Sequence, residues 1–211
     1  MTHIDAIGTR SDAFWRTVAS VEDSGGVLVV AVDRSAESVD RALSVISRFP
    51  ATVTALVGPG EVRTDHATHR IPEIATTSLV LRELSERVCS LPPASRVAVC
   101  HLWAGVSNRL ALAELVRDLG VSRRTVDRSL YGAGLLSLAT QQRCARVASS
   151  WDVLGDGRIG VRYASRTGGF ASERAMALSF RAILGTSPRA AQQHLRTSAV
   201  VERIASCCRH A

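Results

Sequence analysis

The chain has 211 residues, 46% of them hydrophobic, and no apolar run approaches the roughly 20 residues of a membrane-spanning helix, so we expect a soluble cytoplasmic protein of one or two domains without a membrane partner. All 26 basic residues are arginine, which excludes mechanisms that need a lysine, such as a Schiff base or a P-loop. Residues 1–108 hold 10 arginines and 12 acids, whereas residues 109–211 hold 16 arginines and 7 acids, so the second half is predicted to bind a polyanion such as nucleic acid.

The first half of the chain alternates strand-like and helical patterns. The run from Val27 to Val32 has no polar interruption, which favours a strand buried on both faces. Ser35 can cap the helix that follows, and Pro50 ends it. The predicted elements, in chain order, are a helix over residues 11–21, a strand over 27–32, a helix over 36–48, strands over 51–58 and 70–74, a helix over 76–91 and a strand over 96–103.

This order predicts an α/β fold for residues 1–106, in the form of a small receiver-like domain that regulates activity or mediates dimerisation. Asp33 follows the first predicted strand, as an acidic residue does in receiver domains. The chain has no lysine, however, and Ala31 and Val32 stand where a phosphorylated receiver clusters its acids. We therefore interpret the domain as a pseudo-receiver and name a homodimer as the candidate assembly.

The first half offers no set of residues that predicts catalysis or metal binding. His66 and His69 form an HxxH pair beside Asp65, but the pattern places no third ligand, so we expect no metal. The glycines at 58 and 60 follow a predicted strand without forming a dinucleotide fingerprint, and a small ligand there stays an open alternative. We predict neither an enzyme nor a cofactor, because no nucleophile, base and orienting group are recognisable together.

The five cysteines show no CxxC spacing, so we expect free and mostly buried thiols rather than a disulfide framework or a zinc knuckle. Cys207 and Cys208 belong to a polar C-terminal tail predicted over residues 199–211. Because Arg209 and His210 follow them, the alternative is that positive charge favours reactive thiolates there.

Residues 110–130, here called the first unit, carry a helix-turn-helix pattern. An apolar face precedes Gly120, which permits a tight turn with positive φ, and Ser122 caps a second helix. In such a motif the second helix enters the major groove with its N-terminal residues at the base edges. Those residues are Arg123, Arg124, Thr125 and Asp127. Arginine suits guanine and threonine suits the thymine methyl group, while an ordinary helical hairpin is the alternative.

Residues 159–189, here called the second unit, repeat this pattern. A first helix is broken at Gly168 and Gly169, Phe170 plugs the core, and Ser172 caps a second helix that Gly185 ends. Inward positions of that helix are Met176, Phe180, Ile183 and Leu184. A helix around residues 141–154 separates the two units. We predict an all-helical domain over residues 107–198 with two helix-turn-helix units, separated by a distance that suits two adjacent major-groove entries.

At these residues the chain resembles the AraC/XylS family of transcriptional regulators, over about residues 110–190. The second-unit signature of the family is matched without a gap by Gly169, Phe170, Phe180, Arg181, Gly185, Ser187 and Pro188. The first unit is similar at Leu115, Leu119, Gly120, Ser122, Arg128 and Leu130, and the intervening helix at Arg143, Arg146 and Ala148. The resemblance implies double-stranded DNA as a partner and RNA polymerase as a further candidate partner.

Three positions depart from the family pattern. Gly168 replaces an apolar residue, at a cost of about 1 kcal/mol in helix propensity, Leu178 stands where arginine is common, and Ala175 replaces a polar or aromatic residue. The second recognition helix therefore offers few polar groups, mainly Glu173 and Arg174. We expect the first unit to read bases and the second to contact mainly the DNA backbone, as the resemblance implies. The alternative is that the second unit is scaffold.

The sequence thus predicts a sequence-specific DNA-binding transcriptional regulator. Base contacts are assigned to the four residues that follow Ser122, and phosphate contacts or structural ion pairs to Arg128, Arg143, Arg146, Arg174 and Arg181. The rival hypothesis from another class is an adaptor or anti-activator that keeps the helical domain but binds a protein partner. A regulator requires both second helices on one basic face, about 34 Å apart.

Overall fold

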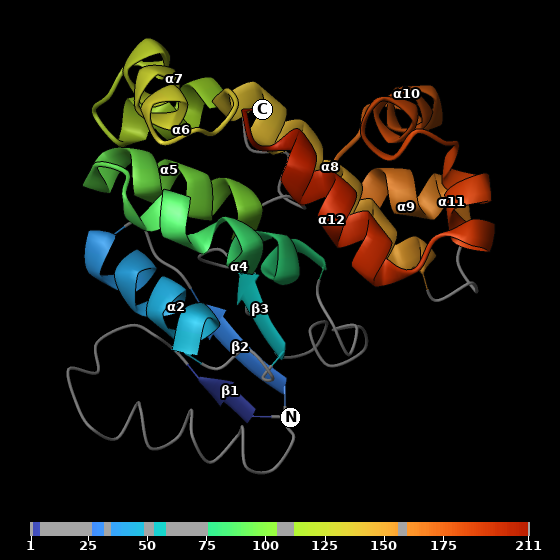
Figure 1. Ribbon diagram of the computed structural model, residues 1–211, viewed down its shortest axis with the longest axis horizontal. Coiled ribbons are helices and arrows are strands. Elements are labelled where there is room, and N and C mark those ends of the chain that lie inside the picture. Colours follow the sequence, from blue (N-terminus) through green and yellow to red (C-terminus); the bar gives the residue numbers. More distant parts are fainter. Residues whose placement is uncertain are drawn as a thin grey trace.

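The computed structural model describes the backbone of residues 2–4, 27–31, 35–48, 53–57, 76–104, 112–155 and 160–210 (Figure 1). Three short strands, β1 (Thr2–Ile4), β2 (Val27–Ala31) and β3 (Val53–Val57), pair in parallel in the order β1-β2-β3. The helices are α2 (Ala36–Arg48), α4 (Thr76–Cys89), α5 (Pro93–Ala104), α6 (Leu112–Asp118), α7 (Arg123–Gly132), α8 (Leu138–Leu154), α9 (Val161–Thr167), α10 (Glu173–Leu184), α11 (Pro188–His194) and α12 (Thr197–Cys207). None of these helices is long and apolar enough to cross a membrane.

The prediction of an α/β, receiver-like N-terminal domain is wrong, although two of its strands, predicted over 27–32 and 51–58, are present as β2 and β3. Every side chain that the structure describes before residue 105 belongs to α2, α4, α5 or the turns beside them, and the predicted strand over 96–103 is the helix α5. All described α5 residues from Val97 to Ala104 are buried, so the segment is apolar on every side, and periodicity cannot separate a buried helix from a buried strand. Pro93 begins this helix, because the first turn needs no N–H donor from it.

Several predictions fall on residues outside the described part of the chain. They are the helix over 11–21, the strand over 70–74, the domain boundary between residues 106 and 107, and the side chains of Asp33, Asp65, His66 and His69 together with the glycines at 58 and 60. The predicted helices over 36–48 and 76–91 are present as α2 and α4.

The buried helix α5 joins the N-terminal helices to the helical second half in one core. It packs against α2 and α4 on one side and against α7 and α8 on the other. The indole Nε1 of Trp103 donates a hydrogen bond to Oε1 of Gln141 on α8 at 3.4 Å, and both residues are buried. Each large apolar side chain buried in this core contributes about 1.5–3 kcal/mol to folding.

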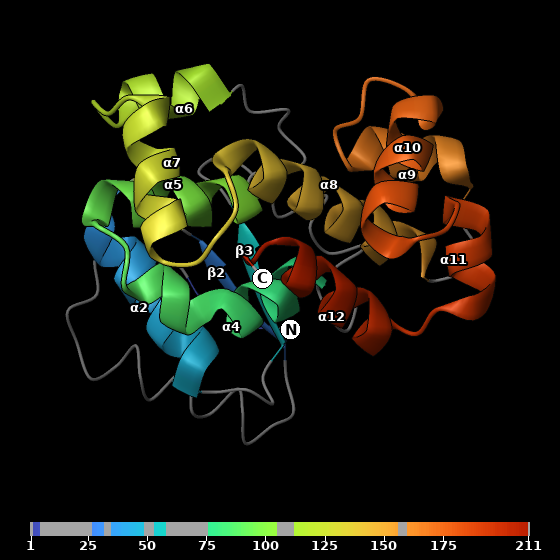
Figure 2. The same ribbon diagram turned by 45° about the horizontal axis from the view of Figure 1, so that its top comes forward.

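Where a C-terminal tail was expected from residue 199, the structure has the helix α12. Val200, Val201, Ile204 and Ala205 are buried on one side of it, at helical spacing. This side packs against α4, α8 and α10, so α12 crosses from the N-terminal helices to the second unit (Figure 2). The segment is part of the core and not a frayed end.

Candidate nucleic-acid interface

In the first unit, α6 and α7 are joined by a glycine turn of the predicted kind. Gly120 has φ of 66°, and the N–H of Val121 donates to the carbonyl of Val116 at 3.1 Å, which closes the end of α6. Ser122 then caps α7, because its Oγ accepts from the N–H of Thr125 at 3.1 Å. The turn and the cap together set the direction in which α7 leaves α6.

In the second unit, α9 and α10 are joined by the same turn with one more residue, Ala171. Gly169 has φ of 67°, and the N–H of Phe170 donates to the carbonyl of Ser165 at 2.9 Å. Ser172 caps α10 by accepting from the N–H of Ala175 at 3.1 Å. Phe170 is only 5% exposed, as expected for a plug between the two helices.

The similarity between the two units extends one helix further than the sequence pattern indicated. Ser137 caps α8 and Ser187 caps α11, and each follows a glycine with positive φ, at Gly134 and Gly185 respectively. Ser137 could have been found from the same rule that identified the other caps, a serine after a turn glycine and before an apolar helix. In each case, therefore, two serine-capped helices follow the first helix in succession.

Asp127 is turned toward α8 instead of outward from α7. Its Oδ1 accepts from the N–H of Leu138 at 2.8 Å, at the start of α8, and its Oδ2 lies 3.6 Å from Nε of Arg123. The carboxylate therefore fixes the α7–α8 corner and holds one arginine of the recognition helix in place. Sequence spacing alone did not indicate this contact, because it spans a turn whose geometry was unknown.

The two recognition helices expose side chains at equivalent positions, counted from their capping serines. Arg124, Arg128 and Tyr131 of α7 correspond to Arg174, Leu178 and Arg181 of α10, and all six are exposed. Within the described part of the chain, no hydrogen bond or ion pair occupies the guanidinium groups of the four arginines in this set. These groups are available to an external anion.

The other predicted contact residues have different surroundings. The hydroxyl of Thr125 lies 2.8 Å from that of Ser122, and Glu173 is exposed in the first turn of α10. Arg143 is exposed on α8, whereas Arg146 is half-buried and already has an interaction partner. The structure therefore gathers the predicted residues into one group on α7, one on α10 and a pair on the helix between them.

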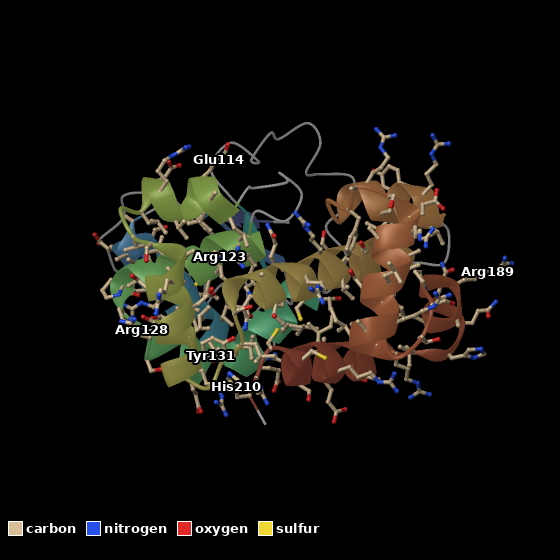
Figure 3. All side chains as sticks on the ribbon, turned by 90° about the horizontal axis from the view of Figure 1, so that it is seen from above. Glu114, Arg123, Arg128, Tyr131, Arg189 and His210 are labelled. Atoms are coloured by element: carbon tan, nitrogen blue, oxygen red, sulfur yellow. The ribbon has the colours of Figure 1, made fainter. Side chains whose placement is uncertain are left out.

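The helix α8 separates the two recognition helices. Figure 1 shows α7 and α10 nearly end on. In Figure 3, which is seen from above, both helices lie in the plane of the picture and run from top to bottom, so their axes are nearly parallel. With 17 residues, α8 is about 25 Å long, and the two units lie toward its opposite ends. This length is of the same order as one turn of DNA, about 34 Å.

Charge is unevenly divided between the two units and their flanking helices. Residues 112–154 hold six arginines and four acids, whereas residues 160–210 hold eight arginines and two acids. The second unit therefore carries most of the basic excess, although its recognition helix has an apolar centre at Leu178, which is 56% exposed. Such a surface suits the sequence-independent attraction of phosphates.

Gly168 is explained by close packing against α8. It ends α9, and a Cβ built on it would lie 2.0 Å from Oγ of Ser150 and 2.8 Å from the carbonyl oxygen of Arg146. The Ser150 hydroxyl also donates to the carbonyl of Ala164 at 3.0 Å. The apolar side chain expected here from the family resemblance would not fit, so the glycine permits the contact between α8 and α9.

A half-buried carboxyl on α8 caps the N-terminal helix α4. Oδ1 of Asp152 accepts from the N–H of Thr76 at 2.7 Å, at the start of α4. Burial raises the pKa of Asp152 from 3.8 to about 7, and its hydrogen bonds with Thr76 and Thr77 only partly oppose that rise. The group is a structural link between the two halves of the chain, far from the exposed arginines in sequence.

The cysteines of the C-terminal segment are not activated thiolates. Burial raises the pKa of the Cys207 and Cys208 thiols, and a hydrogen bond with Cys144 raises that of Cys208 further. The attraction of Arg209 for a Cys208 thiolate is the smaller effect. Among the residues with described side chains, no three His, Cys, Asp or Glu groups gather in a metal-binding arrangement.

Comparison with known proteins adds no family assignment. The chain matches no protein-family model, no curated protein and no solved structure. The functional interpretation therefore depends on the geometry of the two units.

Proposed function

We propose that the protein is a DNA-binding transcriptional regulator of the AraC-like type. The observation that carries the proposal is the pair of serine-capped helices, α7 and α10, that follow equivalent left-handed glycine turns. Both present unpaired, exposed arginines, of which Arg124 and Arg174 stand at equivalent positions. Two such helices at opposite ends of α8 have the scale needed to enter successive major grooves on one face of a duplex.

We assign base reading to the first unit. Arg123 and Arg124 occupy the first turn of α7, where a recognition helix reaches base edges, and arginine pairs with guanine through two hydrogen bonds. Asp127 supports this role indirectly, because its carboxylate lies beside Arg123 and anchors α8. Thr125 and Arg128 are also exposed on α7.

We assign DNA-backbone binding to the second unit. Arg174 and Arg181 lie on either side of Leu178 on the exposed face of α10, and the flanking helices add arginines with few acids. Leu178 cannot donate a hydrogen bond to a base, so this helix is poorly equipped for sequence reading. Its contribution is then affinity that varies steeply with salt.

The test is binding of the purified chain to a pool of random duplex DNA, followed by fluorescence anisotropy as salt is titrated. We expect micromolar affinity that falls steeply with salt, and enrichment of a preferred sequence from the pool. Replacing Arg123→Ala and Arg124→Ala together should weaken binding to the enriched sequence roughly tenfold or more.

The matched control is the pair Arg41→Ala and Arg82→Ala, which removes the same charge from α2 and α4. This control should bind DNA as the unmodified protein does. Unchanged affinity in the Arg123 and Arg124 double variant, with the fold retained by circular dichroism, would remove the basis of the proposal.

A further inference from the structure

We infer that residues 197–210 form a brace that holds the two recognition helices at one distance and orientation, and so sets the spacing of DNA contacts that the protein accepts. The brace consists of α12 and the three residues that follow it. Its consequence for DNA spacing rests on the proposed function, whereas its mechanical role can be tested without DNA.

Two side chains of the brace hold the C-terminal end of α10. The guanidinium of Arg203 donates to the carbonyl of Leu184, and Sγ of Cys207 donates weakly to the carbonyl of Ile183 at 3.7 Å. Carbonyls in the last turn of a helix have no donor within that helix, so these bonds attach α12 to acceptors that need a donor.

The three residues that follow α12 hold the corner after α7. The N–H of Leu136 donates to the carbonyl of Cys208 at 2.8 Å, and the N–H of His210 donates to the carbonyl of Gly134 at 3.0 Å. Between them, Leu135 and Arg209 form an isolated antiparallel bridge. The brace therefore pairs with the backbone directly after the first recognition helix.

A side-chain contact extends this attachment onto α7 itself. The ring of His210 lies 4.8 Å, centroid to centroid, from the ring of Tyr131 in the last turn of α7, and Figure 3 shows the two side by side. Tyr131 occupies the position that Arg181 has in α10, so the C-terminal residues touch the exposed face of one recognition helix.

The brace is also fixed to the shared core. Nε2 of Gln141 on α8 donates to the carbonyl of Cys208 at 3.0 Å, and Arg209 donates to the carbonyl of Glu83 on α4 at 2.6 Å. Val200 and Ile204 of α12 are fully buried. The segment is thus supported by the core as well as attached to α10 and to the corner after α7.

This arrangement gives the two units a second connection besides α8. A single connecting helix leaves the second unit free to rotate about one contact, whereas two separate attachments fix its angle. Each base pair inserted between two DNA contact sites shifts one of them by about 3.4 Å and rotates it by about 34–36° around the duplex. A braced protein therefore discriminates between spacings that a hinged one would tolerate.

The mechanical test measures the distance between α7 and α10 by pulsed electron paramagnetic resonance. Spin labels are attached through a genetically encoded ketone amino acid at positions 128 and 178, which are both exposed, so that the five cysteines stay unmodified. We expect a narrow distance distribution in the full chain, and a broader one when residues 209–211 are deleted and Arg203→Ala is introduced.

The control is Glu202→Ala, an exposed neighbour on α12, which should keep the narrow distribution. The single variant Arg203→Ala serves if the truncated chain loses its fold, as judged by circular dichroism and thermal unfolding. An equally narrow distribution in folded brace variants would overturn the inference, whatever the protein does with DNA.

The spacing test uses the duplex enriched by the unmodified chain, with one or two base pairs inserted between its two contact regions. The insertion should cost the unmodified protein roughly tenfold or more in affinity, and the brace variant clearly less. Equal losses in both would show that the brace does not set spacing. Absence of any DNA binding would contradict the proposed function, while the label distances would still decide the mechanical role.

Discussion

The first and second units share a backbone design but carry different surfaces. In both, a glycine with positive φ ends the first helix, an apolar plug follows, and a serine caps the recognition helix. Beyond the cap the residues differ. When the two helices are aligned at their capping serines, Arg123 corresponds to Glu173 and Arg128 corresponds to Leu178. The backbone of such a unit therefore depends on a few turn and cap residues, which leaves its exposed face free to change.

The difference in charge follows the same division. The first unit lies in a nearly balanced region, and one of its acids, Asp127, is occupied in holding α8 and Arg123. The second unit lies in a region with eight arginines and two acids. A balanced surface with a few positioned arginines suits selective contacts, and a broadly basic surface suits non-selective ones. Two copies of one motif can thus divide specificity and affinity between them.

The largest expected effect comes from removing the equivalent core side chain in each unit. Leu130 and Phe180 are both fully buried at the eighth position after the capping serine. We expect Leu130→Ala to cost about 2–5 kcal/mol and Phe180→Ala about 3–5 kcal/mol in the free energy of unfolding. Because α8 and α12 join both units in one core, chemical denaturation should show a single transition in each variant. Separate unfolding of one unit would break the comparison.

The next effect concerns the α8 carboxyl that caps α4. The folded protein keeps a proton on Asp152 up to about pH 7, whereas the unfolded chain releases it near pH 3.8, so the free energy of unfolding should fall as pH rises between these values. Asp152→Asn keeps an acceptor for the Thr76 N–H without the charge. It should raise stability by a few kcal/mol at pH 8 and change it little at pH 4. The same gain at both pH values would argue against this explanation.

Glycine-to-alanine substitutions in the two units should change the free energy of unfolding differently. Gly168→Ala places a Cβ against Ser150 and the Arg146 carbonyl, so it should destabilise the protein by about 1–3 kcal/mol. Gly132→Ala lies in the last turn of α7, where a Cβ meets nothing within 4 Å, so it should be neutral or stabilise by about 0.4–1 kcal/mol. Thermal unfolding measures both. A harmless Gly168→Ala would mean that α8 and α9 are not packed as closely as described.

The smallest effect is expected from substitutions at the exposed position in the middle of α7 and α10. Leu178→Arg adds a cation to α10, and Arg128→Leu removes one from α7. In a plot of log affinity against log salt, the first should steepen the slope by about 0.9 and the second should reduce it by a similar amount. If neither slope changes, these positions do not face the duplex.

The sequence predicted local features well and tertiary ones poorly. The turn at Gly120, the caps at Ser122 and Ser172 and the plug at Phe170 were all identified, because each depends on residues within one turn of the chain. The helix α5 was mistaken for a strand, since burial on all sides removes the periodicity that separates the two. The contact of Asp127 with Leu138 and the packing of Gly168 against Ser150 depend on how helices meet, which no local pattern encodes.

One matched pair of variants, Arg124→Ala and Arg174→Ala, at the same position of α7 and α10, tests the division of roles between the two units most directly. Anisotropy should be measured on the enriched duplex and on a shuffled duplex of the same composition, over a range of salt. We predict that Arg124→Ala lowers the preference for the enriched duplex by about 1–3 kcal/mol, and that Arg174→Ala weakens both complexes equally and reduces the salt slope by about 0.9. Loss of preference in Arg174→Ala with none in Arg124→Ala would contradict the division of roles between the two units.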